Sequence, residues 1–181
     1  MTESAKRINR KKIFKGKIFT VAEDTIEFPN GAQAKWDILL HDGAAAIVPI
    51  DNDGMIVLVE QYRGVADGMI LEIPAGKLEK NEDPALCAAR ELEEETGYKA
   101  KKVERIGSIY SAVGFSDEVI ELFVAKGLEE GTLNLDEDEY VNVKKYTLQE
   151  VMDMVLSGKI KDSKTISAIF IVKEMVLNKM L

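Results

Sequence analysis

An arginine and three glutamates, Arg90, Glu91, Glu94 and Glu95, lie within six residues of one another. On a helix, which turns about 100° per residue, glutamates spaced i, i+3 and i+4 share one face. Like charges on one face repel one another unless a cation lies among them, and carboxylate oxygens suit Mg²⁺ or Mn²⁺. Taken alone, the run also fits a solvated acidic helix face. Arg90 can pair with a carboxylate and hold it in place.

A helix over residues 84–96 is expected to position these side chains. Asp83 is a suitable N-cap, and Pro84 suits the first helical position, where its missing N–H has no helical partner in any case. Gly97 suits the left-handed position that ends a helix. The glutamates then occupy a sector beside the predicted buried face, which consists of Ala85, Ala88, Ala89, Leu92 and Thr96. The backbone over residues 74–76 leads into this helix.

Residues 76–98 resemble the Nudix box, G-x5-E-x7-R-E-U-x-E-E-x-G-U, in which U is bulky and apolar, and every fixed position matches. The resemblance implies that Glu91 and Glu95 bind metal and that Glu94 is a third ligand or positions water. It implies that Arg90 orients the glutamates and that Glu82 supports or binds the metal. The carbonyl of Ala75 would complete a metal site. Two or three ions would neutralise a diphosphate and polarise the attacking water.

The resemblance extends to ADP-ribose pyrophosphatases through the runs Val59–Arg63 and Leu71–Glu79. It implies that Arg63 contacts a substrate phosphate, which a guanidinium fork fits, and that Glu72 belongs to the substrate site. In this subfamily a later acidic loop supplies the general base, and here we expect Glu137, with Glu139 as the second candidate. His41 is the single histidine and is expected to be structural, so a carboxylate base is also favoured by elimination.

One segment departs from the subfamily. Residues 111–118 carry Val113 where the family has proline, although Gly114 and Glu118 are retained as candidate substrate residues. The resemblance makes ADP-ribose the leading substrate. Because of this departure, other nucleotide sugars remain alternatives, as do nucleoside triphosphates, and a non-catalytic ADP-ribose sensor is a third possibility. The segment 1–42 is expected to form a homodimer and part of the substrate pocket. Phe28 or Trp36 would stack on adenine there, unless each packs in the core.

Composition limits the classes of partner. The 181 residues carry a formal charge of −8, which disfavours nucleic acid and anionic membranes as partners. An acidic protein acting on phosphates needs a divalent metal to offset charge repulsion, and Mg²⁺ is the expected cofactor, with Mn²⁺ as the alternative. Cys87 is the only cysteine, so neither an intrachain disulfide nor a thiolate zinc cage is expected. The polar start and the absence of long apolar runs predict a cytoplasmic protein.

The order of elements predicts the fold class. A β-hairpin is expected around Asn30–Gly31 within residues 11–40. Further strands are expected over 44–50, 55–62, 69–73, 103–110, 119–125 and 141–146, and helices over 147–157 and 163–180. This order indicates an α/β (α+β) layered sandwich. With the resemblance, we predict a Nudix-type α/β/α sandwich with a mixed sheet over 43–181, preceded by a small N-terminal antiparallel β segment over 1–42.

Overall fold

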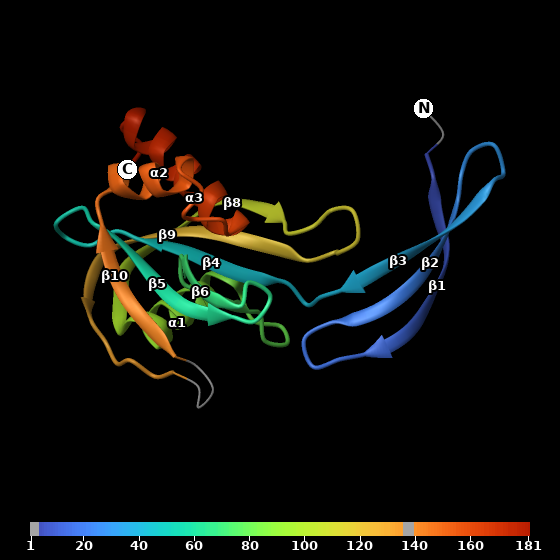
Figure 1. The fold of residues 1–181 in the computed structure, drawn as a ribbon, viewed down its shortest axis with the longest axis horizontal. Helices are drawn as coiled ribbons and strands as arrows, with labels where there is room; N and C mark the ends of the chain where they lie inside the picture. Colours follow the sequence, from blue (N-terminus) through green and yellow to red (C-terminus); the bar gives the residue numbers. More distant parts are fainter. Residues whose placement is uncertain (1–3, 136–139) are drawn as a thin grey trace. The chain divides into compact units, whose positions relative to one another are not determined.

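The computed structural model describes residues 4–135 and 140–181 (Figure 1). The chain divides into two compact units. The small unit comprises residues 1–43 with Tyr110–Val119, and the large unit comprises Ala44–Ile109 with Ile120–Leu181. Each unit is described below by itself.

The small unit is built on an antiparallel sheet in the order β1-β2-β3, with β1 at Lys6–Lys15, β2 at Thr20–Glu27 and β3 at Gln33–Leu40. The predicted hairpin is present, because Glu27 pairs with Gln33 and Gly31 takes a φ of 79° in the connecting turn. Strand β1 begins earlier than predicted, at Lys6. Its residues are almost all exposed, so it shows no alternation of apolar and polar residues that would reveal a strand.

The large unit contains two sheets, in the orders β10-β5-β6 and β7-β4-β9-β8. Strand β4 runs parallel to β9 and antiparallel to β7, which makes the second sheet mixed. The strands of the two sheets are β4 (Ala44–Pro49), β5 (Ile56–Arg63), β6 (Gly68–Glu72), β7 (Ala75–Lys77), β8 (Tyr98–Tyr110), β9 (Val119–Glu130) and β10 (Val141–Tyr146).

Helices cover both faces of β4. Ala44, Ala46 and Val48 join a core cluster with residues of α2 (Leu148–Leu156) and α3 (Ser163–Leu177). Ala45 and Ile47 point the other way and join a cluster with residues of α1 (Pro84–Thr96). Because successive side chains of a strand point to opposite faces, this alternation produces a helix–sheet–helix sandwich. The predicted α/β/α class with a mixed sheet is confirmed.

The caps explain where the helices begin and end. The Asp83 carboxylate accepts a hydrogen bond from the Ala85 N–H at the start of α1, and Gly97 ends that helix with a φ of 72°, both as predicted. Helix α3 stops at Leu177 instead of residue 180, since Lys179 takes a left-handed φ of 55°. In the part of the chain that is described, no helix combines the length and the apolar character needed to cross a bilayer.

Candidate active site

The site is organised around the guanidinium of Arg90 on α1. Its Nε and Nη2 donate to the Glu82 carboxylate at 3.0 and 3.2 Å. Its Nη1 donates to Glu91 Oε1 at 2.7 Å and to Glu94 Oε2 at 2.8 Å. One cation therefore gathers three of the box carboxylates, and the hydrogen bonding of Arg90 to Glu82 is the largest reason that the pKa of Arg90 is raised.

Glu82 lies in the loop that precedes α1 and is held from two directions. Its carboxylate also accepts a hydrogen bond from the Glu79 N–H at 2.9 Å. The hydrogen bond from Arg90 is the main cause that lowers the pKa of Glu82 below its ordinary value. Glu82 is therefore a stable anion that ties the loop to the helix.

Glu91 packs against the backbone of β7. A Cβ atom added to Gly76 would overlap the Glu91 carboxylate. The φ of Gly76 is not positive, so the requirement for glycine here is space and not backbone conformation. This contact gives the first glycine of the motif a specific task, which is to let the Glu91 carboxylate lie directly on the strand.

Glu95 is buried, with only 3% of its surface exposed. Its Oε2 accepts a hydrogen bond from the Ala75 N–H at 3.1 Å, and its Oε1 accepts one from Gln61 Nε2 at 3.3 Å. The helical spacing placed Glu95 in a sector beside the buried face, whereas it belongs to that face. Gln61 was quoted in a motif but not predicted as a site residue, and its place on the inner face of β5 is the signal that could have revealed it.

The donor chemistry fits a divalent metal ion. Among residues 4–135 and 140–181, no three His, Cys, Asp or Glu side chains are already gathered as a metal ion requires. Glu91 and Glu94 instead meet at Nη1 of Arg90, so their oxygens can approach a shared positive charge. The surrounding donors are oxygens, which hard divalent cations prefer. The assignment of Glu82, Glu91, Glu94, Glu95 and the Ala75 carbonyl as ligands stays a prediction.

A second charged group links β5, β6 and α3. Arg63 donates to both oxygens of Glu72, with Nε–Oε1 at 2.7 Å and Nη2–Oε2 at 3.1 Å. Glu72 also accepts a hydrogen bond from Lys164 Nζ. Burial by itself would raise the pKa of Glu72, but the hydrogen bond from Arg63 and the charge of Lys164 outweigh it, so the pKa is lowered. Lys164 was not predicted, because its partner is 92 residues away in sequence.

The remaining described candidates lie in the small unit. Glu118 Oε1 is 3.4 Å from His41 Nδ1, and that nitrogen accepts a hydrogen bond from the Gly43 N–H. A Cβ on Gly114 would meet no atom within 4 Å. Phe28 and Trp36 pack edge to face with their ring centroids 6.3 Å apart, and Trp36 is 48% exposed. The substrate roles of these four candidates stay predictions.

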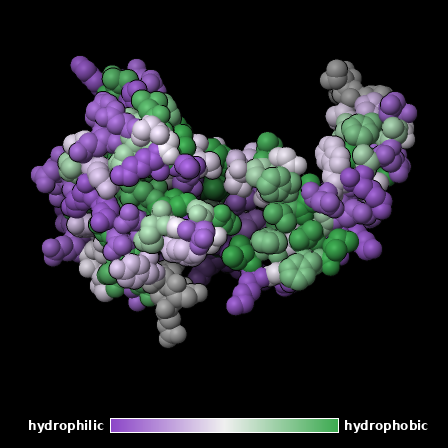
Figure 2. Space-filling view, in the orientation of Figure 1, coloured by the Kyte–Doolittle hydropathy of each residue, from purple (hydrophilic) through white to green (hydrophobic). Residues whose placement is uncertain are grey.

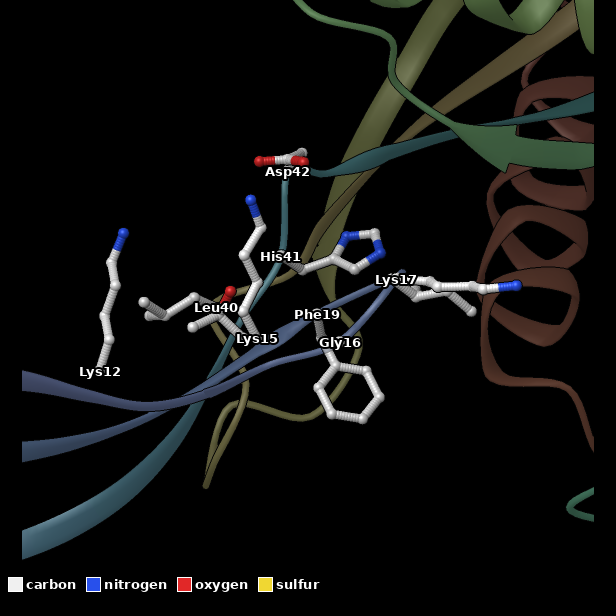
Figure 3. Close-up of a pocket in the computed structure, with 10 residues that line it drawn as sticks. Lys12, Lys15, Gly16, Lys17, Phe19, Leu40, His41 and Asp42 are labelled. Carbon is white, nitrogen blue, oxygen red and sulfur yellow. The ribbon is translucent and has the colours of Figure 1, made fainter.

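A pocket of the small unit is lined by lysines and the end of β3, but it does not contain Phe28, Trp36, Gly114 or Glu118. Figure 3 shows the ammonium group of Lys17 pointing away from those of Lys12 and Lys15. The three cations therefore do not converge on one point. Glu137 and Glu139, the candidate general bases, lie outside the described residues.

Comparison with known proteins adds independent findings. The NUDIX domain family model matches residues 40–168. The methanol dehydrogenase activator of Bacillus methanolicus is 46% identical over 166 residues, covering 91% of this chain and 90% of that protein. The ADP-ribose pyrophosphatase of Bacillus subtilis (strain 168) is 43% identical over 166 residues, with the same two coverages. A crystal structure described as an ADP compounds hydrolase has a TM-score of 0.88 and 24% identity, covering 98% of this chain and 96% of that chain. At that identity it establishes the fold.

Proposed function

Because this chain belongs to the Nudix family, we propose that it is a divalent-metal-dependent pyrophosphohydrolase that cleaves ADP-ribose to AMP and ribose 5-phosphate. The membership confirms the resemblance predicted from residues 76–98. The observation that carries the substrate is the 43% identity, over 91% of the chain, to a relative named ADP-ribose pyrophosphatase. The intact set of box glutamates around Arg90 supports catalysis and disfavours a sensor that only binds its ligand.

In this proposal Glu91, Glu94 and Glu95 hold the metal, together with the Ala75 carbonyl and with Glu82 in support. Mg²⁺ is the proposed ion, and when bound it would neutralise the diphosphate and lower the pKa of a water molecule. Arg90 keeps Glu91 and Glu94 close together before any ligand arrives. The hydrogen bonds from Gln61 and the Ala75 N–H fix the orientation of Glu95.

The reaction consumes one water. The water oxygen bonds to one phosphorus of the diphosphate while the bond from that phosphorus to the bridging oxygen breaks. The bridging oxygen leaves with the second phosphoryl group, and the water proton passes to a carboxylate base. We propose Glu137 for that base, with Glu139 as second candidate, and Arg63 as the cation that contacts a substrate phosphate. Replacement of Glu137 by glutamine is then expected to lower kcat. If Glu139 is the base instead, its replacement by glutamine causes the larger loss of kcat.

We further propose that the N-terminal segment, residues 1–42, forms a homodimer interface and contributes to the substrate pocket. Its sheet leaves large apolar side chains exposed, and Figure 2 shows hydrophobic residues grouped over it. The exposed large side chains of this segment include Ile8, Ile13, Phe14, Ile18 and Trp36, which are between 48% and 62% exposed. Exposed apolar groups of this kind mark interaction surfaces. Light scattering of the wild type and of Phe14→Glu tests the interface, since the variant is expected to be monomeric.

Activation of a dehydrogenase is a second candidate function, favoured by the relative named methanol dehydrogenase activator. It is tested by adding the purified protein to a methanol dehydrogenase assay. A rise in rate that depends on an intact Glu95 would join the two functions, whereas no change in rate would remove this candidate.

The proposed hydrolysis is tested by product analysis. The purified protein is incubated with Mg²⁺ and a panel of ADP-ribose, other ADP- and UDP-sugars, dinucleotides and nucleoside triphosphates. AMP and ribose 5-phosphate from ADP-ribose, abolished by a chelator, are the expected products. Pyrophosphate released from a triphosphate, or cleavage of another sugar nucleotide alone, would overturn the substrate and retain the chemistry. Tight ADP-ribose binding without turnover would favour a sensor.

A further inference from the structure

Lys164 is a buried cation in an electrostatically unfavourable place. It is the second residue of α3, and only 8% of its surface is exposed. The N-terminus of a helix carries a partial positive charge, so a lysine there is disfavoured. Removing an ammonium group from water adds a further cost unless the group is paired. The helix itself therefore does not favour a lysine at this position. The contacts of the Lys164 ammonium group must provide the stabilisation.

Two carboxylates meet the Lys164 ammonium group. Asp162, the N-cap of α3, lies with its Oδ2 at 3.1 Å from Nζ. The same Asp162 oxygen accepts hydrogen bonds from the N–H and the hydroxyl of Thr165, at 3.0 and 2.6 Å. The other partner is Glu72 Oε2, which belongs to β6. Lys164 thus connects the start of α3 to the sheet through a carboxylate that a second cation also uses.

That second cation is Arg63, and it alone reaches the solvent. The side chains of Glu72 and Lys164 are 3% and 10% exposed, whereas that of Arg63 is 41% exposed. Both Arg63 Nη2 and Lys164 Nζ contact Glu72 Oε2. Two cations therefore share one carboxylate, so the charge of Glu72 does not fully neutralise the Arg63 guanidinium. The negative charges of Glu95 and Asp162 also act on Arg63 and, after the hydrogen bond with Glu72, help to raise its pKa.

We propose that Lys164 is a positioning residue for Arg63, which holds Glu72 in place and offsets its charge, so that the guanidinium keeps positive charge for an anionic phosphate of the substrate. This inference rests on the proposed function where it concerns the substrate. The arrangement of Lys164, Glu72 and Arg63 itself does not depend on which nucleotide is cleaved. Without Lys164, Arg63 becomes the only strong partner of Glu72, and its attraction for phosphate falls.

The kinetic test compares Lys164→Met, which keeps the unbranched chain up to the ε position and removes the charge, with Lys145→Met. Lys145 is an ion-paired lysine of the same unit, 2.9 Å from Asp51, and serves as the matched control. We expect Lys164→Met to raise KM for ADP-ribose about 10-fold with kcat nearly unchanged, and Lys145→Met to change neither. In an Arg63→Ala background, Lys164→Met should add little, because it acts through Arg63. Additive effects, or a loss confined to kcat, would overturn the proposal.

A second readout needs no substrate and separates this proposal from the proposed function. The Arg63 Nε–H group, assigned by its loss in Arg63→Lys, is followed by ¹H–¹⁵N NMR. Its signal should move in Lys164→Met, while the Nε–H signal of Arg90, bonded to Glu82, stays in place. A change at Arg63 in a protein that cleaves no nucleotide would uphold the positioning and refute only the substrate. An unchanged Arg63 signal overturns the positioning. If Lys164→Met does not fold, Lys164→Gln, which keeps a donor for Glu72, carries both tests.

Discussion

The carboxylate of Glu91 occupies the space that a Cβ atom on Gly76 would need. This relationship joins two positions of the box that are 15 residues apart in sequence. It explains in steric terms why the motif opens with glycine: the carboxylate can lie against β7 only where the strand has no side chain. The carboxylate of Glu91, a predicted metal ligand, can therefore occupy this position only because Gly76 of β7 has no side chain.

Replacing Gly76 by alanine should therefore lower activity more than stability. The atoms that the new methyl group would meet are at the far end of the Glu91 side chain, which can swing away. We expect turnover of ADP-ribose to fall about 100-fold, because a displacement of about 1 Å at a catalytic group has this effect. The free energy of unfolding should change by less than about 2 kcal/mol. Both quantities are measured on the purified variant.

The matched control is Gly64→Ala, at an exposed glycine without positive φ whose added Cβ would meet no atom within 4 Å. It should leave both turnover and stability near the wild-type values. Turnover of Gly76→Ala equal to that of Gly64→Ala would show that the close packing of Glu91 has no catalytic importance.

Glu72→Gln should cost stability in a way that depends on pH. The pKa of Glu72 is lowered from its ordinary value of 4.5, so the folded state favours the carboxylate. Its stabilisation is therefore fully present above about pH 4.5 and is lost as the pH falls through the lower folded-state pKa. Near pH 7 we expect a loss of about 3 kcal/mol, because the buried Lys164 and the partly exposed Arg63 lose their shared anion.

Urea unfolding of the wild type and Glu72→Gln, at several pH values from 7 down to about 3.5, measures this dependence. The difference between the two should shrink only below about pH 4.5. Glu129→Gln, which removes an ion pair whose carboxylate is 60% exposed, should cost little at any pH. A difference at Glu72 that stays constant down to the lowest pH would contradict the ionised, doubly paired state.

Cys87 should be unreactive in the folded protein. Its side chain is fully buried on α1, and burial, followed by the charge of Glu82, raises the pKa of the thiol to about 12. Only the thiolate is nucleophilic, and at pH 8 roughly one thiol in 10⁴ is ionised. We expect no reaction with a thiol-specific disulfide reagent in buffer and one thiol per chain after unfolding in guanidinium. Rapid reaction in buffer would mean that α1 opens readily.

The sequence predicted those elements whose signals are local. Asp83, Pro84 and Gly97 mark the ends of α1, and the predicted helix from residue 147 is present as α2, which begins at a capping box of Thr147 and Glu150. The continuous apolar runs that form β4 and β5 were equally readable. The first residues of strand β1, from Lys6 to residue 10, were not predicted, because the exposed, basic residues of this strand follow no burial pattern. Its pairing with β2, together with the Arg10–Asp24 ion pair, defines it in three dimensions.

The charged groups of the site were only partly predictable, for a physical reason. A motif names Glu95, but helical spacing cannot tell that Glu95 is buried, since this depends on Gln61 and the Ala75 N–H from other strands. Lys164 has no local signal at all. A lysine in the first turn of a helix reads as a solvated side chain, and only the packing of α3 against β6 brings it to Glu72.

The central claim is tested most directly by comparing Glu95→Gln with the wild type in one assay, the release of AMP and ribose 5-phosphate from ADP-ribose with Mg²⁺. Circular dichroism and thermal unfolding are measured in parallel to confirm that the variant is folded. We predict chelator-sensitive products from the wild type and, from a folded variant of similar shape, turnover lower by about 100-fold or more. A folded Glu95→Gln that releases both products at nearly the wild-type rate would contradict the account.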